Sequence, residues 1–174
     1  MSKHCCCGKT KNKKVIAIEY LYLDLNTCTR CVGTDKVLES VLDELRNAFK
    51  LAGYSLEYHK VKIETEEMAK AYRFLSSPTI RVNGRDICKS VQENNCGCCG
   101  DIAGTQVNCR VFTYKGKQYE VPPSEMLAEA ILKMAFMPKK SFYWPDRYVL
   151  PDNLKKFFDG KKQMCCEGSS CGCC

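Results

Sequence analysis

The sequence predicts an α/β fold, and three observations support this prediction. Residues 15–24 (VIAIEYLYLD) are rich in β-branched and aromatic residues and are apolar on both alternating faces, which is typical of a central strand covered on both sides. Residues 36–51 repeat apolar side chains at helical spacing. Further strand and helix patterns alternate along the chain up to Pro138. With 174 residues, the chain is long enough for one domain that buries a core without cross-links.

The first helix and the second strand follow directly from these patterns. Residues 36–51 carry apolar residues on one side and charged residues on the other, which predicts an amphipathic helix closed by Gly53. Residues 54–63 alternate between apolar and polar and then change phase, so we expect a strand with a possible bulge.

A second helix and a short strand come next. Thr65 is placed to cap the helix, and acidic residues in its first turn favour the helix dipole. We expect a buried stripe at Met68, Tyr72 and Leu75. Residues 79–82 read as a strand that runs into an Asn-Gly turn.

The second half of the domain holds a hairpin and a helix. Residues 109–114 and 118–121 form the predicted hairpin, and the segment that begins with two prolines at 122–123 opens a helix that stops before Pro138. Between the short strand and the hairpin, residues 84–107 are predicted to be irregular. A loop of that length is usually functional or disordered. Beyond Pro138 we expect an aromatic stretch at 142–145 and a short helix at 154–158.

The two ends of the chain differ in charge from its middle. Residues 1–14 hold five lysines and no acidic residue, and residues 138–174 hold seven Lys or Arg against four acidic residues, so the net charge of +7 lies in the ends. A nucleic-acid-binding domain carries positive charge on its folded body, so we expect no nucleic-acid partner. We divide the chain into a basic tail (1–14), a folded domain (15–137) with an insertion (84–107), and an extension (138–174).

The N-terminal residues also bear on localisation. Residues 1–14 lack the apolar stretch of a signal peptide, and the next run is interrupted by Glu19 and Asp24. We therefore expect a cytoplasmic protein without a membrane partner. In a reducing compartment, clustered cysteines more often indicate metal binding or redox chemistry than structural disulfides.

Fifteen cysteines make thiol chemistry the main functional signal. Cys28 and Cys31 form a Cys-x-x-Cys pair between the first strand and the first helix. The pKa of a thiol falls at a helix N-terminus and beside positive charge, so Cys28, two residues before Arg30, is the expected nucleophile and Cys31 the resolving thiol. The alternative is a pair of core cysteines without chemical function.

The order strand, Cys-x-x-Cys, helix, strand, helix, Ser-Pro-Thr, strand, hairpin, helix resembles the thioredoxin-like superfamily over residues 15–136. Cys28, Cys31 and Pro78 carry this resemblance. It implies a three-layer sandwich with a central mixed sheet, a cis peptide bond before Pro78, and a catalytic site formed by these three residues. The cysteine-rich tails and insertion resemble a prokaryotic branch of unassigned function.

The chain departs from thioredoxin around the dithiol. Thioredoxin has Trp before its first Cys and Gly-Pro between the two, whereas this chain has Thr27 before Cys28 and Thr29-Arg30 between the cysteines. General disulfide reduction therefore does not follow from the fold. A helix that starts late, at Thr34 or Asp35, would also leave the dithiol in a loop.

Three thiols within four positions mark the insertion: Cys96, Cys98 and Cys99. Neighbouring glycines let the backbone fold closely around an ion, and converging thiolates suit zinc, copper(I), mercury, trivalent arsenic or an iron–sulfur cluster. A redox role beside the dithiol and an inert loop stay open. The resemblance implies that the insertion starts at the end of the sheet away from Cys28 and Cys31, so it must fold back to reach them.

The C-terminal cysteines are a second candidate metal site, formed by Cys165, Cys166, Cys171, Cys173 and Cys174. Adjacent cysteines on a flexible segment can chelate and transfer a soft ion, and an inert, unstructured tail is the alternative. Cys5, Cys6 and Cys7 form a similar cluster beside His4.

These observations lead to one principal hypothesis and two alternatives. The principal hypothesis is an enzyme, a thiol–disulfide oxidoreductase that acts on a protein or small-molecule disulfide through Cys28 and Cys31, with accessory cysteines that bind soft metal or metalloid ions. The first alternative is a non-enzymatic protein that sequesters or transfers such ions. The second is a structural zinc or iron–sulfur protein built around Cys96, Cys98 and Cys99.

Overall fold

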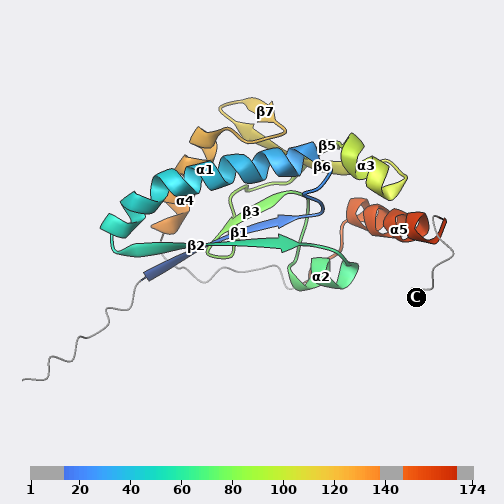
Figure 1. Cartoon of the computed structure of the whole chain (residues 1–174), viewed down its shortest axis with the longest axis horizontal. Coiled ribbons are helices and arrows are strands. Elements are labelled where there is room, and N and C mark those ends of the chain that lie inside the picture. The colour runs from blue at the N-terminus through green and yellow to red at the C-terminus, as the bar shows by residue number, and fades with distance from the viewer. Residues whose placement is uncertain (1–13, 138–146, 168–174) are drawn as a thin grey trace, which may run out of the picture.

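The computed structural model describes residues 14–137 and 147–167, with the backbone alone for residues 165–167, and shows a mixed α/β fold (Figure 1). One sheet has four strands in the order β2-β1-β3-β4. These strands are β1 (Lys14–Tyr22), β2 (Tyr54–Lys62), β3 (Thr79–Val82) and β4 (Arg85–Asp86). Strand β1 is parallel to β2 and antiparallel to β3, so the sheet is mixed.

A second, antiparallel sheet contains three strands in the order β5-β6-β7. These are β5 (Gln92–Asn95), β6 (Asn108–Tyr114) and β7 (Lys117–Tyr119). The helices are α1 (Thr29–Leu51), α2 (Glu66–Ala71), α3 (Gly97–Ala103), α4 (Ser124–Ala135) and α5 (Asp152–Glu167).

Two groups of buried apolar side chains form the core. The first lies between the four-stranded sheet and helices α1 and α4, and it includes Ile18, Ile80, Leu38 and Leu127. The second lies at the end of the molecule where α3 packs on α5, and it includes Phe74 and Phe158. Cysteines from three separate parts of the chain belong to this second group.

The predicted strands β1, β2 and β3 and the two predicted helices that follow β1 and β2 are confirmed, but α1 begins at Thr29 and not at Lys36. Thr65 caps α2, with its Oγ1 accepting a hydrogen bond from the backbone N of Met68 at 3.2 Å. Asn83 and Gly84 have φ of 51° and 77°, as expected of a two-residue hairpin turn. The hairpin of β6 and β7 and the helix α4 also match their predicted positions.

Two local predictions for this region are wrong. The register of β1 with β2 runs without interruption from Lys14 and Tyr54 to Tyr22 and Lys62, so the proposed bulge is absent. Leu75 is 40% exposed, and Phe74 is buried in its place. The reason is that α2 ends at Ala71 and the chain then turns at Arg73, where φ is 47°, so Leu75 does not continue the helical stripe.

The prediction of an irregular segment at 84–107 is also wrong, because this segment contains β4, β5 and α3. Glycine has low helix propensity, and two of the seven residues of α3 are glycines, so the local pattern did not favour a helix. Packing against α5 stabilises α3 in spite of that composition. The predicted helix at 154–158 extends over the whole of α5, so the backbone of Cys165 and Cys166 is helical.

Several predictions fall on residues outside the described ranges. They concern the basic tail, the aromatic stretch at 142–145 and the cysteines at positions 5–7, 171, 173 and 174. Within the described ranges, no helix combines the length and the apolar character needed to cross a membrane.

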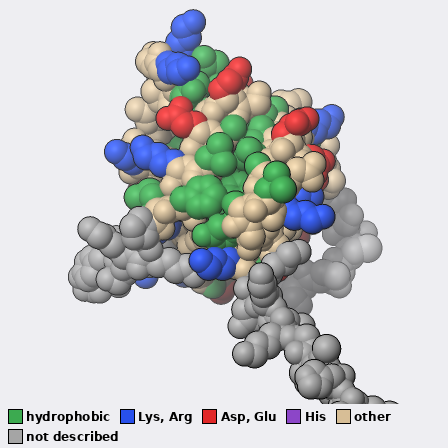
Figure 2. Space-filling model, turned by 90° about the vertical axis from the view of Figure 1, so that its left-hand side faces the viewer, with side chains coloured by type: hydrophobic (Ala, Val, Ile, Leu, Met, Phe, Trp, Pro, Cys, Tyr) green, Lys and Arg blue, Asp and Glu red, His purple; other side chains and the backbone are tan. Residues whose placement is uncertain are grey.

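The end of the molecule opposite α3 and α5 is apolar. Figure 2 shows apolar side chains gathered on this end with charged side chains around them. Leu51, at the end of α1, is 91% exposed, and Phe136, which follows α4, is 52% exposed and stacks on Phe49.

Candidate thiol centre

Cys28 lies at the junction of β1 and α1. It is the N-cap residue of α1, and its carbonyl oxygen accepts a hydrogen bond from the backbone N of Val32 at 2.9 Å. The helix therefore begins directly after Cys28 and not at Thr34 or Asp35. This places the Cys28 sulfur at the positive end of a 23-residue helix, where a thiolate is favoured.

The loop before Cys28 is organised by one carboxylate. Asp24 Oδ1 accepts hydrogen bonds from the backbone N of Asn26, of Thr27 and of Cys28, the last at 3.2 Å, and from the Thr27 hydroxyl. Burial raises the pKa of Asp24, but the hydrogen bonds from Thr27, Cys28 and Asn26 outweigh this effect and hold it below the ordinary value. The ionised carboxylate thus fixes the position of Cys28.

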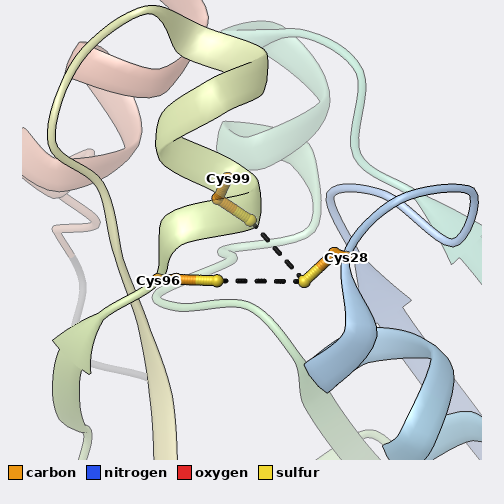
Figure 3. A group of neighbouring side chains, drawn as sticks. All are labelled: Cys28, Cys96 and Cys99. Carbon is orange, nitrogen blue, oxygen red and sulfur yellow. Dashed lines mark hydrogen bonds between the residues drawn. The ribbon is translucent and has the colours of Figure 1, made fainter.

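Cys96 and Cys99 reach Cys28 from the insertion. Cys96 is the N-cap residue of α3 and Cys99 lies one turn further along the same side of that helix. Figure 3 shows both side chains directed at Cys28 from across the gap between α3 and the start of α1. The insertion therefore does fold back onto the dithiol.

The three sulfur atoms form a compact, buried group. The Sγ of Cys28 lies 3.9 Å from that of Cys96 and 3.8 Å from that of Cys99, and all three sulfurs lie within 4.8 Å of one another. Cys28 and Cys99 are fully buried and Cys96 is 4% exposed. Among the described residues, this group has the composition and spacing of a metal site.

Cys109 extends the group through β6. Its Sγ donates to the Sγ of Cys99 at 3.3 Å, and Cys99 in turn donates to Cys28. Thiol hydrogens are thus directed along a chain that ends at the Cys28 sulfur. Cys109 is itself fully buried, but it does not belong to the group of three mutually close sulfurs.

Cys31 occupies a different position from the other thiols. It lies in the first turn of α1, and its Sγ is 3.4 Å from the hydroxyl oxygen of Ser77. The Ser77–Pro78 peptide bond is cis, as the resemblance implied, and directly precedes β3. Tyr20 donates from its hydroxyl to the carbonyl oxygen of Cys31 at 2.7 Å and so holds this turn against β1.

The ionisation of the thiols follows from their hydrogen bonds. The surrounding thiols, Cys109 first among them, hold the pKa of Cys28 well below its ordinary value and outweigh the effect of burial. The hydrogen bond to Cys28 and burial raise the pKa of Cys31. Cys28 is therefore the thiolate of the pair and Cys31 the thiol.

The other thiols divide in the same way. The neighbouring thiol of Cys109 lowers the pKa of Cys96 to about 7. The bond from Cys109 also lowers the pKa of Cys99, but the bonds that Cys99 makes to Cys28 and Cys96, with burial, outweigh it and raise the pKa. The pKa of Cys109 is raised by its bonds to Cys28 and the other thiols and by burial.

Arg30 has a different role from the one expected. Its buried guanidinium donates to the carbonyl oxygens of Cys109 at 3.0 Å and Asn95 at 3.3 Å, and it forms an ion pair with Glu120 at 2.6 Å. It thereby ties the start of α1 to β5 and β6, the strands on either side of α3. The thiols, more than this guanidinium, account for the low pKa of Cys28.

A second set of contacts holds the insertion against α5. The side chain of Asn153 donates to the carbonyl oxygen of Asn108 at 2.6 Å and accepts from the backbone N of Asn108 at 2.8 Å. Gly160 of α5 lies directly against the backbone of Ala103 at the end of α3. These contacts fix α3 in the position from which Cys96 and Cys99 reach Cys28.

The predicted site residues are thus partly brought together. Cys28, Cys96 and Cys99 meet, and Cys31 and Pro78 lie in the adjacent turn and loop. Cys98 is half-buried and points its Sγ at the Thr29 hydroxyl, 3.7 Å away, outside the three-sulfur group. Cys165 and Cys166 lie on α5, of whose last three residues only the backbone is described, and Cys171, Cys173 and Cys174 fall outside the described residues.

Sequence reasoning missed Cys109, and it did not single out Cys96 and Cys99 as the two insertion cysteines that meet Cys28. Cys109 lies in a strand of mostly buried residues and looks like an ordinary core residue. A signal for this arrangement was present, because Cys96 and Cys99 form a second Cys-x-x-Cys within the folded domain, and two such pairs in one domain are typical of a metal site.

Comparison with known proteins yields one match. The model of a family described as a domain of unknown function (DUF2703) matches residues 16–131, about two thirds of the chain. This range includes Cys28 and Cys31, Cys96 and Cys99, and Cys109. No curated protein and no solved structure matches the chain.

Proposed function

We propose that this chain, which belongs to the DUF2703 family, binds a soft metal or metalloid ion through Cys28, Cys96 and Cys99. The convergence of their three buried sulfur atoms is the observation that carries the proposal. Thiolate sulfur prefers soft and borderline ions such as zinc, copper(I), mercury and trivalent arsenic.

The sulfur spacing suits such an ion. A zinc–sulfur bond of about 2.3 Å and tetrahedral angles place two sulfur ligands roughly 3.8 Å apart. The distances from Cys28 to Cys99 and to Cys96 are 3.8 Å and 3.9 Å. Ionisation also fits, because Cys28 is a thiolate and the pKa of Cys96 is about 7. Cys109, beside Cys99, is a further thiol available to the same ion.

Cobalt(II) is a suitable probe for this proposal, because tetrahedral thiolate coordination gives it characteristic visible and charge-transfer absorption. We expect the full-length, anaerobically reduced protein to bind one cobalt ion more tightly than any other, and this tightest equivalent should give these absorption bands. Excess zinc should displace the cobalt and remove the bands. The variants Cys96→Ser and Cys99→Ser should each weaken this equivalent about tenfold or more, as loss of a ligand does.

Cys98→Ser is the matched control, because Cys98 lies in the same helix but outside the three-sulfur group. It should leave the tightest equivalent unchanged. If Cys98→Ser weakens binding as much as Cys96→Ser does, the ion is held by another set of cysteines and the proposed centre is wrong.

Dithiol–disulfide exchange through Cys28 and Cys31 is a second candidate function, and it accompanies the proposal of a thioredoxin-like fold. The strand order β2-β1-β3-β4, with β1 parallel to β2 and antiparallel to β3, supports that fold. A further observation favours the reaction: Cys28 is a thiolate at the start of α1, one turn from the thiol of Cys31.

The exchange would proceed in two steps. The Cys28 thiolate attacks one sulfur of a substrate disulfide, which forms a mixed disulfide and releases the other sulfur as a thiolate. Cys31 then loses its proton and attacks the sulfur of Cys28, which closes the Cys28–Cys31 disulfide and releases the second substrate sulfur. Two electrons and the proton of Cys31 thus pass to the substrate, and the other substrate thiolate takes any second proton from water. Because α3 covers Cys28, it must move aside before a substrate can enter.

Reduction of a small chromogenic disulfide under turnover with dithiothreitol tests this second function. Wild-type protein should accelerate the reaction, and Cys28→Ser should abolish the acceleration. Activity that survives in Cys28→Ser, or that is absent from the wild type with every reductant, would exclude exchange at this pair. The cobalt experiment is independent of this result.

A further inference from the structure

A cavity of about 390 Å³ lies on the face of the four-stranded sheet that α1 and α4 do not cover. Thr79 and Arg81 of β3 line it, whereas Ile80 and Val82 point to the opposite side and belong to the core beneath α1 and α4. Successive residues of a strand face opposite sides of its sheet, so the cavity and that core are on different faces.

Cationic side chains dominate the lining. Its basic residues are Arg73, Arg81, Lys89 and Arg147. Arg81 already donates to the backbone carbonyl oxygens of Tyr72 and Arg73, whereas Lys89 and Arg147 are exposed. Asp86 is the lining acid, and it already forms an ion pair of 2.9 Å with the buried Arg110. Glu19 lies opposite Arg81 in the register of β1 and β3 and supplies one further negative charge nearby. Among the described residues that line the cavity, basic side chains therefore outnumber acidic ones, and Lys89 and Arg147 are the exposed basic residues.

Exposed apolar side chains also line the cavity, together with Thr79 and Ser90. Leu75, Val91 and Val149 are 40%, 38% and 66% exposed, and all three line the cavity. Tyr148 closes the wall beside them, with its hydroxyl donating to the carbonyl oxygen of Phe74 at 2.6 Å. A concave site that combines apolar walls with a few charged groups is the usual form of a small-molecule site.

We infer that this cavity binds a small organic anion whose carboxylate or phosphate group pairs with Lys89 and Arg147 and whose apolar part lies against Leu75, Val91 and Val149. Guanidinium groups bind both kinds of oxyanion through paired hydrogen bonds. The cavity is separate from the three-sulfur group, so this inference goes beyond the proposed ion binding and does not depend on it.

Isothermal titration calorimetry on the full-length, reduced protein tests the inference with three probes. One probe combines an anionic group with an apolar ring, and the other two each carry one of these groups. Phenyl phosphate carries both the anion and an apolar ring, inorganic phosphate carries the anion alone, and benzyl alcohol carries the ring alone. We expect phenyl phosphate to bind more tightly than either of the others and to weaken as salt is added.

Single substitutions locate the site. Arg147→Gln and Lys89→Gln should each weaken phenyl phosphate about threefold to fivefold, the usual size of one exposed charge contact. Val149→Ser should weaken phenyl phosphate and leave inorganic phosphate unchanged. Lys133→Gln, an exposed lysine on α4 outside the cavity, is the control and should change nothing.

Three outcomes would overturn the inference. Wild-type protein could show no heat of binding with phenyl phosphate. Arg147→Gln and Lys89→Gln could bind as Lys133→Gln does, which would place any bound anion elsewhere. Inorganic phosphate could bind as tightly as phenyl phosphate, which would exclude the apolar contact. Cys96→Ser should bind phenyl phosphate normally, so failure of the thiol centre and failure of this site can be told apart.

Discussion

Cys28 takes part in two different sets of sulfur atoms. One is the dithiol with Cys31 on the same helix, and the other is the group with Cys96 and Cys99 from α3. The hydrogen-bonded chain from Cys109 through Cys99 ends at Cys28, so this sulfur carries the negative charge that several neighbouring thiols stabilise. A thiolate in that position can serve as a nucleophile or as a metal ligand, and the protein's chemistry depends on which set engages it.

The pKa of the Cys96 thiol can be measured directly and reports on this distribution of charge. Its pKa is about 7, against an ordinary value of 9.0, so the folded state favours its thiolate. The stabilisation from this ionisation is fully present above about pH 9 and is lost as the pH falls through 7. We expect the ultraviolet thiolate absorbance of the reduced protein to show a step near pH 7.

Cys96→Ser should remove the step near pH 7. Cys88→Ser is the control, because burial raises the pKa of Cys88 and this thiol therefore titrates at higher pH. A step that persists in Cys96→Ser, or that disappears in Cys88→Ser, would mean that another cysteine is responsible for it.

Asp24 is the residue that positions Cys28, and its effect can be separated from its charge. Asp24→Ala removes the acceptor of four hydrogen bonds in the loop before α1. We expect it to lower the free energy of unfolding by about 1–2 kcal/mol, as loss of a helix-start acceptor does, and to weaken cobalt binding. Denaturant unfolding and cobalt titration measure the two effects.

Asp24→Asn keeps one side-chain oxygen acceptor and loses the charge. Most of the stability and of the cobalt affinity should survive in this variant. If Asp24→Asn behaves like Asp24→Ala, the negative charge and not the hydrogen-bond geometry would be the important property of this residue.

At the scale of secondary-structure elements, the centre depends on α3 and on the helix that supports it. A Cβ on Gly160 of α5 would overlap the backbone carbonyl of Ala103 in α3, and a backbone atom cannot move aside as a flexible side chain can. Gly160→Ala should therefore destabilise the protein by about 2 kcal/mol or more. It should also weaken cobalt binding, because α3 carries Cys96 and Cys99.

Gly97→Ala is the matched change within α3. A Cβ at Gly97 meets nothing within 4 Å, and alanine favours a helix over glycine by about 0.5–1 kcal/mol. We expect this variant to be as stable as the wild type or slightly more stable and to bind cobalt normally. Equal thermal unfolding of the two variants would show that the α3–α5 contact does not control the site.

The elements that could be predicted from the sequence are those with a clear local pattern. The spacing of apolar residues predicts the strand before Cys28 and most of α1. Thr65 predicts the start of α2, and Asn83-Gly84 predicts a turn. Helix α3 could not be predicted in this way, since its glycines oppose a helix and its order comes from α5. The contact between Cys28 and Cys96 joins residues 68 positions apart, and no local pattern reports such a contact.

At the scale of the whole molecule, the thiol centre lies where the four-stranded sheet and the second sheet meet. Cys28 follows a strand of the first sheet, Cys109 belongs to a strand of the second, and α3 connects strands β5 and β6 of the second. Arg30 joins the two parts by donating to carbonyl oxygens in β6 and at the end of β5. An ion held by these cysteines would therefore cross-link both sheets and stabilise the folded state.

Because both proposed functions need Cys28, they should exclude each other. Closing a Cys28–Cys31 disulfide removes one of the three sulfurs from the ion, so oxidation of zinc-loaded protein by a small disulfide should release zinc in proportion to the disulfide formed. A zinc-binding dye and peptide mapping by mass spectrometry measure the two products. The zinc-loaded protein should also be oxidised more slowly than the zinc-free protein, since the ion occupies the nucleophile.

Cys31→Ser distinguishes this competition from general oxidation of the cluster. The variant keeps Cys28, Cys96 and Cys99, so it should bind zinc as the wild type does but should release it more slowly under the same oxidant. Equal rates of release from the two proteins, with a disulfide mapped to Cys99 and Cys109, would locate the redox reaction at that pair, whose sulfurs lie 3.3 Å apart. Cys28 and Cys31 would then serve only ion binding and the fold.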